Sequence, residues 1–456
     1  MNSRTEDFPE RRAAGAPSGA AGLAHIPGES GLPWFGNARE FLTDARALAR
    51  RMRTTYGPVS RGRFLGQDFV ALGGADALQF VLADRDKLFS SELGWQHSIG
   101  RLFTRGLMLL DFDEHRYHRR IMQAAFKREA LEFYLGSMNQ VVADTLPGWA
   151  AKSDFRFYPA VKQLTLDNAA VAFLGVELGA DADRLNKAFI DTVAASLSVV
   201  RVPIPGLALW RGLKGRQLLS DFFRRQIPLR RASDKADMFT RLCHARSDEG
   251  AEFSDQEIVD HMIFLMMAAH DTLTSSLTTA VRALAEHPDW QQRLRDDSRA
   301  LGADGLAYDD LDGLQRHDWV FNEALRLWGP VPYIPRRAIR EFEYGGYRIP
   351  ANTQISISPD VVHHDAKYWN APERFDPERF GPDRQEHKSH PFAFAPYGGG
   401  AHKCIGMHFA QILAKVFLHR LLLTYRIEMP ADYAPRTRQL PMPKPVDGLR
   451  LSLQRL

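Results

Sequence analysis

Cysteine is scarce in this sequence: among 456 residues, only Cys243 and Cys404 are cysteines. Two cysteines cannot supply a framework of disulfide bonds, so we expect a reducing compartment, the cytoplasm. The chain also has no uninterrupted apolar run of about twenty residues, so we expect no membrane-spanning helix and no transmembrane anchor. Its formal net charge of +4 is small for this length and gives no reason to expect a nucleic-acid partner.

Residues 1–25 lack the apolar core of a secretion signal and are rich in alanine and glycine. We expect a disordered tail here, although Arg11 and Arg12 leave a transit peptide as an alternative. The composition is that of an ordinary globular protein, with 45% hydrophobic and 25% charged residues. Because no internal repeat or change of composition marks a second domain, residues 26–456 are predicted to form one large domain.

Helical periodicity dominates this domain, and short strands are expected near both ends of it. Ser254 and Glu257 form a predicted capping box, and the long helix that follows is apolar all round at residues 262–269, which indicates burial. The expected helices include residues 38–55, 255–286, 319–327 and 407–423. The expected strands lie at residues 59–64, 68–72, 337–348 and 353–358. The predicted fold is mainly α with small β-sheets, an α+β arrangement.

Cys404 lies in a glycine-rich loop, residues 396–406, that leads directly into a predicted helix. A helix N-terminus and the basic neighbour Lys403 both favour the thiolate, the form that binds a metal. An incidental buried cysteine is one alternative. A zinc site that uses His402 and His408 is another, but it lacks a fourth ligand at a suitable spacing. The loop predicts that Cys404 is the axial ligand of a haem iron.

Glu323 and Arg326 are three residues apart on a predicted helix, so they share one face and can form an ion pair. Their neighbours are apolar, which indicates burial rather than a solvated surface pair. A buried pair needs further partners to offset the loss of hydration. Arg379, within the segment Pro377-Glu378-Arg379-Phe380, is a candidate third member.

Asp271 and Thr272 stand in the middle of the long apolar helix, where a carboxylate is costly without a partner or a function. The threonine hydroxyl can bond back to a carbonyl one turn earlier and bend the helix. An acid next to an alcohol beside a closed apolar site can deliver protons. A helix kink without chemistry is the alternative.

His115 and Arg119 are four residues apart, so they lie on one helix face and could hold an anion in a fixed position. A solvated basic face is the alternative.

These four elements, in this order, resemble the cytochrome P-450 family of haem-thiolate monooxygenases, and the resemblance runs from about residue 26 to the C-terminus. It implies a cytochrome P-450 fold, a single large domain around haem b (iron protoporphyrin IX), with Cys404 as the proximal iron ligand. It implies haem propionate contacts from His402, His115, Arg119 and Arg336, with Arg337 as the alternative to Arg336. It also implies a buried structural triad of Glu323, Arg326 and Arg379, and a proton-delivering pair of Asp271 and Thr272.

Three residues depart from the family pattern. Tyr397 stands where the family usually has phenylalanine in the cysteine loop, so a buried hydroxyl would need a partner. Ala269 replaces a common glycine three residues before Thr272, and its methyl group narrows the groove there. His402 replaces the usual arginine, which makes its propionate contact sensitive to pH.

By the same resemblance, residues 92–110 cover the substrate, residues 196–210 form an access lid, and residues 331–334 face the pocket. Their apolar content favours a lipid, sterol or terpenoid. Electrons are expected from an acidic ferredoxin or flavodoxin-type partner, docked on a basic face. The candidates for that face are Arg116, His118, Arg120, Lys127, Arg128, Lys403 and Lys415.

The function expected is the insertion of one oxygen atom from O2 into an apolar small molecule. One alternative is a peroxide-driven peroxygenase, which would usually lack the acid–alcohol pair. A non-catalytic haem-binding sensor is the other.

Overall fold

The computed structural model describes residues 20–456, except 151–153, 197, 199–201, 248–249 and 440–441. Of the expected tail, residues 1–19 lie outside the described residues. Ala20–Leu23 form a short 3-10 helix, η1, and the Leu23 side chain is fully buried. The imidazole of His25 also bonds to the Arg348 carbonyl at 2.7 Å. Residues 20–25 therefore belong to the fold rather than to the predicted tail.

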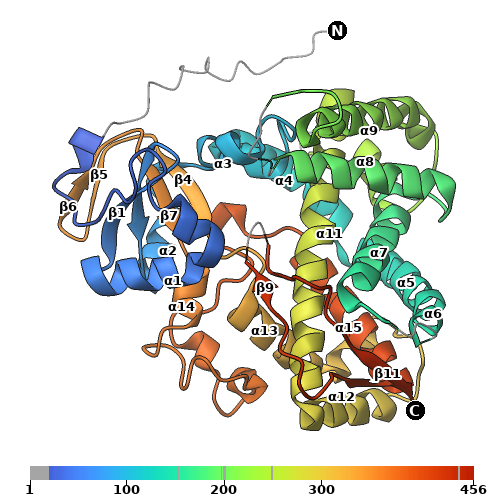
Figure 1. Ribbon diagram of the computed structural model, residues 1–456. Coiled ribbons are helices and arrows are strands. Elements are labelled where there is room, and N and C mark those ends of the chain that lie inside the picture. The colour runs from blue at the N-terminus through green and yellow to red at the C-terminus, as the bar shows by residue number, and fades with distance from the viewer. Residues whose placement is uncertain (1–19, 151–153, 197, 199–201, 248–249, 440–441) are drawn as a thin grey trace.

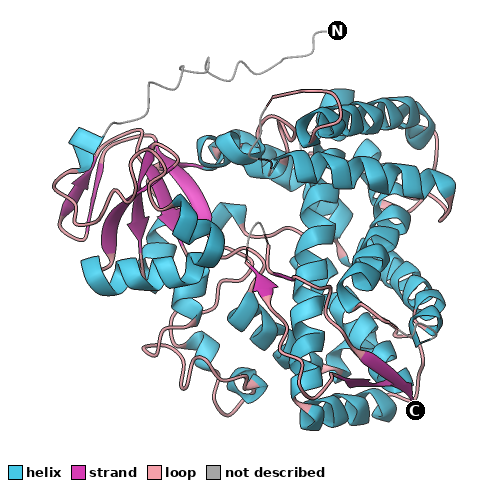
Figure 2. Ribbon diagram, in the orientation of Figure 1, coloured by secondary structure: helices cyan, strands magenta, loops and turns pink. Residues whose placement is uncertain are grey.

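Helices make up most of the described chain, and the strands gather mainly at one side of it (Figure 2). The helices of the first half are α1 (Ala38–Tyr56), α2 (Ala75–Ala83), α3 (Ser91–Ile99), α4 (Phe112–Gln123), α5 (Arg128–Thr145), α6 (Pro147–Ala150), α7 (Phe157–Ala169), α8 (Ala180–Ser196) and α9 (Ala208–Arg231). Those of the second half are α10 (Met238–His244), α11 (Asp255–Glu286), α12 (Pro288–Ala300), α13 (Gln315–Trp328), α14 (Pro359–His363) and α15 (Met407–Thr424). The predicted helices at 38–55, 255–286 and 407–423 are confirmed within one residue, whereas α13 begins four residues before the predicted start.

The long helix α11 passes through the centre of the molecule, with α7 on one side and α8 and α9 across its N-terminal end (Figure 1). It begins at the predicted capping box: the Ser254 hydroxyl accepts from the Glu257 amide, and the Glu257 carboxylate accepts from the Ser254 amide at 2.7 Å. Most of its side chains are buried, as its apolar sequence predicts. This helix therefore supplies one rigid wall for any site at the centre.

The main sheet combines strands from the two ends of the sequence, in the order β1-β2-β7-β4-β3. Its strands are β1 (Val59–Phe64), β2 (Gln67–Leu72), β3 (Phe89–Ser90), β4 (Ile334–Ala338) and β7 (Gln354–Ile357). Strands β1 and β2 form the predicted antiparallel pair, and β2 runs parallel to β7. Small ladders join β5 (Phe342–Tyr344) to β6 (Tyr347–Ile349), β8 (Tyr425–Glu428) to β11 (Ser452–Arg455), and β9 (Thr437–Arg438) to β10 (Lys444–Pro445).

Two groups of buried apolar side chains hold these parts together. One lies among the helices around α11, and the other lies between the main sheet, α2 and the loops before Cys404. The loop that carries Cys404 therefore joins the sheet side of the molecule to its helical side.

Candidate functional site

The Cys404 loop folds tightly against the end of α2 before it enters α15. Gly400 has a φ of +60°, and any side chain there would collide with the Leu82 carbonyl, so glycine is required. The Cys404 amide donates to the Tyr397 carbonyl at 2.9 Å, which closes the turn. The sulfur thus sits three residues before the first residue of α15.

The surroundings of the Cys404 sulfur act in opposite directions on its ionisation. Burial dominates and raises the pKa of the thiol, while the backbone N–H of Gly406 and the charges of Arg119 and Lys403 lower it. The contributions predicted from the helix terminus and the basic neighbours are therefore present and lower the pKa, while desolvation opposes them. A bound metal cation deprotonates a coordinating thiol outright, so the sulfur is suited to a metal rather than to free thiolate chemistry.

Four basic side chains from three parts of the chain meet beside this loop: His115 and Arg119 of α4, Arg336 of β4, and His402. The rings of His115 and His402 lie face to face, with centroids 3.9 Å apart and planes at 31°. Burial, and then the neighbouring arginine charges, lower the pKa of His115 to about 4. Burial likewise lowers the pKa of Arg336 to about 10. Desolvation therefore disfavours the charged forms of both His115 and Arg336.

One member of this cluster, His115, is not satisfied by the described protein around it. His115 is only 1% exposed, yet neither of its ring nitrogens has a hydrogen-bond partner among the described residues. The hydrogen bond from the Arg336 guanidinium goes to the carbonyl of its own neighbour, Pro335, at 2.8 Å. Buried donors without acceptors are rare in folded proteins. The cluster fits an anionic ligand, such as the two carboxylates of haem b, next to a sulfur that suits its iron.

Arg336 and Arg337 face opposite sides of β4, and the structure brings only Arg336 to this cluster. Arg337 donates instead to the side chains of Asn352 and Gln354, at 3.1 and 3.2 Å. The alternation of a strand explains the difference, because adjacent side chains point to opposite faces.

Glu323, Arg326 and Arg379 meet in a fully buried ion-pair network. Arg326 makes two parallel hydrogen bonds to the Glu323 carboxylate, at 2.7 and 2.8 Å, and Arg379 donates to the same carboxylate at 3.0 Å. All three side chains are 0% exposed. The Asp376 amide and the Glu386 carboxylate complete the hydrogen bonding. The network ties α13 to the loop before Cys404.

Asp271 and Thr272 are adjacent on α11 and point to different neighbours. The Thr272 hydroxyl donates to the Ala268 carbonyl at 2.7 Å, one turn earlier. Asp271 forms an ion pair with Lys162 of α7 at 3.0 Å and lies 3.2 Å from the His270 ring. Burial opposes the ionisation of Asp271, but its interactions with His270 and Lys162 outweigh burial and hold its pKa below the ordinary value. The acid is thus tethered to α7 rather than bonded to the threonine.

Two expectations about the surroundings need correction, and one disfavoured alternative gains no support. His118 is 3% exposed and bonds to His261, and Lys415 is paired with Asp318 at 2.7 Å, so neither is available on the expected docking face. Tyr333 does not face the pocket, since it packs on Phe41 of α1. No group of three or more potential metal-binding side chains occurs in the part of the chain that the structure describes, so His402, Cys404 and His408 do not form a zinc site.

The comparisons with known proteins agree with this arrangement. The family model described as Cytochrome P450 matches residues 26–447. The chain belongs to the cytochrome P450 family. A relative called putative cytochrome P450 136, from Mycobacterium tuberculosis, is 44% identical over 98% of this chain and 92% of its own. Human cytochrome P450 26B1 is 29% identical over 92% of this chain and 85% of its own.

A solved structure, described as retinoic acid bound cyanobacterial CYP120A1, superposes with a TM-score of 0.86. It is 29% identical and covers 94% of this chain and 99% of its own. The P450 chain is therefore an oxidoreductase, a monooxygenase whose cofactor is haem b. Its substrates are O2 and an apolar molecule, and its electrons come from a redox partner. Among the described residues, none of the helices is long and apolar enough to cross a membrane.

Sequence reasoning missed the partners of Asp271. Lys162 lies 109 residues before it on another helix, and nothing near either residue in the sequence marks the pair. The one available signal was the presence of an acid, Asp271, in an otherwise apolar stretch of α11. A buried acid indicates that a basic side chain lies nearby in the fold, but it does not identify that side chain.

Proposed function

We propose that this P450 oxidises an apolar small molecule of the lipid, sterol or terpenoid class. The observation that carries the proposal is the composition of the segment that follows α3. Its side chains Ile99, Leu102, Phe103, Leu107 and Leu109 are all buried with the helical core around α11. The solved neighbour bound to retinoic acid, a long apolar molecule with a terminal carboxylate, supports the same class.

Each predicted site residue has a proposed role that its position supports. Cys404 would hold the iron, and His115, His402, Arg119 and Arg336 would bind the propionates. When bound, haem supplies the reductive activation of O2 and the oxidation of the substrate. Glu323, Arg326 and Arg379 would keep the cysteine loop in place. The apolar walls would exclude water from the site.

Thr272 and Asp271 would hold and move protons. The Thr272 hydroxyl has a carbonyl acceptor in its own helix, so it can receive a hydrogen bond while it donates one. Asp271 would take up a proton from solvent after release from Lys162, and pass it on by a change of rotamer.

The test is the replacement of Thr272 by Ala, with Thr278→Ala as a matched control. Both hydroxyls donate to a carbonyl four residues earlier in α11, but Thr278 lies almost two turns away. We expect Thr272→Ala to divert electrons from product to hydrogen peroxide, measured as product and peroxide per NADPH consumed. Thr278→Ala should keep the wild-type ratio. An unchanged ratio in Thr272→Ala contradicts the proton role. Full activity with added peroxide alone favours the peroxygenase.

We propose an acidic ferredoxin or flavodoxin as the electron donor, in a cytoplasmic location. Arg116, Arg120, Lys127 and Lys403 are exposed on α4 and around the cysteine loop, which supports a positive docking face. Arg120→Glu should slow reduction by such a donor and weaken its salt dependence, measured by stopped flow. An unchanged rate at low salt contradicts this docking face.

A further inference from the structure

Residues 102–106 join α3 to η2 (Leu107–Leu109) and are fastened to two helices that are distant in the sequence. Arg216 of α9 donates to the Leu102 carbonyl at 2.7 Å and to the Thr104 hydroxyl at 2.9 Å. The Thr104 hydroxyl in turn donates to the Asp260 carboxylate of α11 at 3.2 Å. Arg216 and Asp260 also form an ion pair at 3.3 Å. We call the group of Arg216, Asp260 and Thr104 the entry latch.

Within the entry latch the carboxylate is withdrawn from water, whereas Arg216 is 25% exposed and Thr104 is exposed. The Asp260 side chain is 5% exposed, and its second oxygen accepts from Gln256 at 3.0 Å. A partly buried ion pair is screened less by salt than a surface pair is. Removal of Arg216 would leave the buried Asp260 carboxylate without its counter-charge. Two residues after Thr104, Gly106 lies so close to the Phe264 ring of α11 that any side chain at position 106 would collide with the ring. The segment is therefore pinned at several points along five residues.

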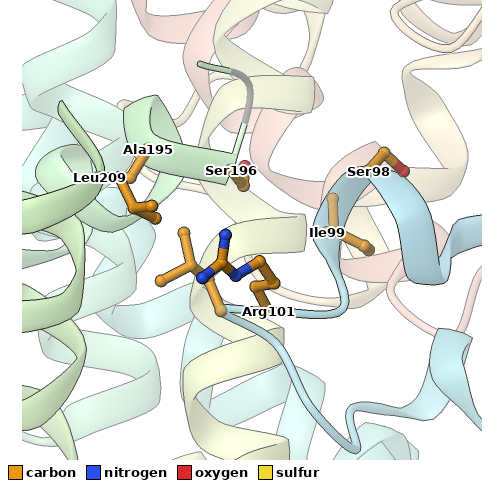
Figure 3. Close-up of a pocket in the computed structure, with 7 residues that line it drawn as sticks. Ser98, Ile99, Arg101, Ala195, Ser196 and Leu209 are labelled. Carbon is orange, nitrogen blue, oxygen red and sulfur yellow. The ribbon is translucent and has the colours of Figure 1, made fainter. Parts of the chain in front are cut away.

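The pinned segment continues one wall of a narrow pocket (Figure 3). Ser98, Ile99, Arg101 and Leu102 line one side, and Ala195, Ser196 and Leu209, from the facing ends of α8 and α9, line the other. The volume of the pocket is about 10 Å³, the room of a single water molecule. A larger molecule cannot pass between these walls unless one of them moves.

We propose that the entry latch controls the passage of apolar ligands between α3 and the facing ends of α8 and α9. Arg216 is then a positioning residue that sets the rate of entry and exit, because it holds Leu102 at the pocket wall. The inference rests on the proposed function in one respect: the apolar substrate is taken to enter between α3 and the facing ends of α8 and α9.

The test uses two ligands of the haem iron that need no turnover. Imidazole is small, and clotrimazole is bulky and apolar; both shift the Soret band, so stopped-flow mixing of the haem-loaded enzyme gives their association and dissociation rates. In Arg216→Ala we expect both clotrimazole rates to rise about tenfold, the factor that one lost charge-assisted hydrogen bond allows. The imidazole rates should not change. Neither ligand is a substrate, so a negative result for the entry latch does not contradict the proposed reaction. A negative result for the proposed reaction likewise does not contradict the entry latch.

The matched control is Arg231→Ala. Arg231 is the last residue of α9 and also reaches α11, where it forms an ion pair with Asp255 at 2.8 Å rather than with a residue of the entry latch. Its clotrimazole rates should equal those of the wild type. Thr104→Val, which removes one hydroxyl and keeps the side-chain shape, should raise both rates by a smaller factor and covers the case that Arg216→Ala does not fold.

Hydrogen exchange measured by mass spectrometry reports on the segment directly. Peptides that contain residues 102–106 should exchange faster in Arg216→Ala than in Arg231→Ala. Faster exchange without faster clotrimazole binding overturns the proposal, because the segment then moves without controlling entry. A rise in the dissociation rate alone also overturns it, since that marks a weakened binding site rather than a gate. Unchanged exchange shows that Arg216 does not hold the segment.

Discussion

The molecule has two buried clusters of acidic or basic side chains, one around Glu323 and one around His115, and they differ in how completely they are hydrogen-bonded. The Glu323 carboxylate accepts from Arg326, Arg379 and the Asp376 amide, all within 3.0 Å. In contrast, both ring nitrogens of His115 lack a partner in the part of the chain that the structure describes, and Arg336 bonds to its own neighbour. A complete network is a self-contained support for the fold, whereas an incomplete one is preorganised for a ligand that brings its own acceptors.

The largest effect is expected on the incomplete side, at Cys404. In Cys404→Ser the iron loses its sulfur ligand, so the reduced CO complex should lack the strongly red-shifted Soret band and product formation should fall to background. The measurement is a reduced-CO difference spectrum with product analysis. The control, Cys243→Ala, removes the second cysteine at a buried site and should keep the band. A wild-type band in Cys404→Ser contradicts the ligand assignment.

The next effect is on the complete side. Glu323→Gln leaves the buried Arg326 without a counter-charge and leaves Arg379 with that of Glu386 alone, so we expect a loss of about 3–5 kcal/mol in the free energy of unfolding. Urea unfolding followed by circular dichroism measures it. The control is Glu378→Gln, which breaks the exposed pair with Arg293 at 2.6 Å and should cost at most about 1 kcal/mol. Equal losses in both variants contradict the structural role of the triad.

His115→Phe sharpens the comparison, because it should separate ligand binding from stability. The haem-free protein should be as stable as the wild type or more stable, since a buried polar group without partners is removed. Haem affinity should fall about tenfold with the loss of a charge-assisted hydrogen bond. Haem transfer to an acceptor apoprotein measures the affinity. Arg337→Gln, on the opposite face of β4, should retain it. A destabilised apoprotein with unchanged haem affinity would reverse the assignment.

The smallest expected effect is at His317, and it tests whether one buried nitrogen without a partner is enough to identify a ligand-binding site. His317 is 1% exposed, and its Nδ1 has no partner among the described residues. Burial lowers its pKa from 6.5 to about 3. The unfolded chain therefore binds the proton first, and the stability from this group, complete above pH 6.5, is lost as the pH falls toward 3.

Between pH 6.5 and 5.5 that loss amounts to about 1 kcal/mol. His317→Gln should lack this part of the acid destabilisation, measured by thermal unfolding at both pH values. His408→Gln, at an exposed position, should keep the wild-type dependence. An identical pH dependence in all three proteins contradicts a neutral buried His317. Haem affinity should be unchanged throughout, because His317 does not belong to the cluster of His115, Arg119, Arg336 and His402.

Local patterns in the sequence predicted much of the fold. The capping box at Ser254 and the apolar run behind it placed α11 at Asp255–Glu286, because both signals act within a few residues. The strand pair β1 and β2 was equally local. The spacing of Glu323 and Arg326 predicted their pairing for the same reason, and Arg379 followed from the family pattern.

Contacts between distant segments were beyond local patterns. The tether of Asp271 to Lys162 joins α11 to α7, and the entry latch joins α9 to α11 and residues 102–106. Nothing in the sequence near Arg216 distinguishes it from the other arginines of α9. The helix terminus and the charges beside Cys404 could be read from the sequence, whereas desolvation could not, because it depends on everything packed around the sulfur.

The parallel pairing of β2 with β7 has a consequence for how the protein is made. Leu72 and Ile357 are neighbours in the sheet, yet 285 residues separate them along the chain. During synthesis the β1–β2 hairpin must therefore wait with one edge open until most of the polypeptide has left the ribosome. Cys404 emerges later still, after the last strand of that sheet. Ligation of the iron by Cys404 therefore cannot begin before the final stage of translation.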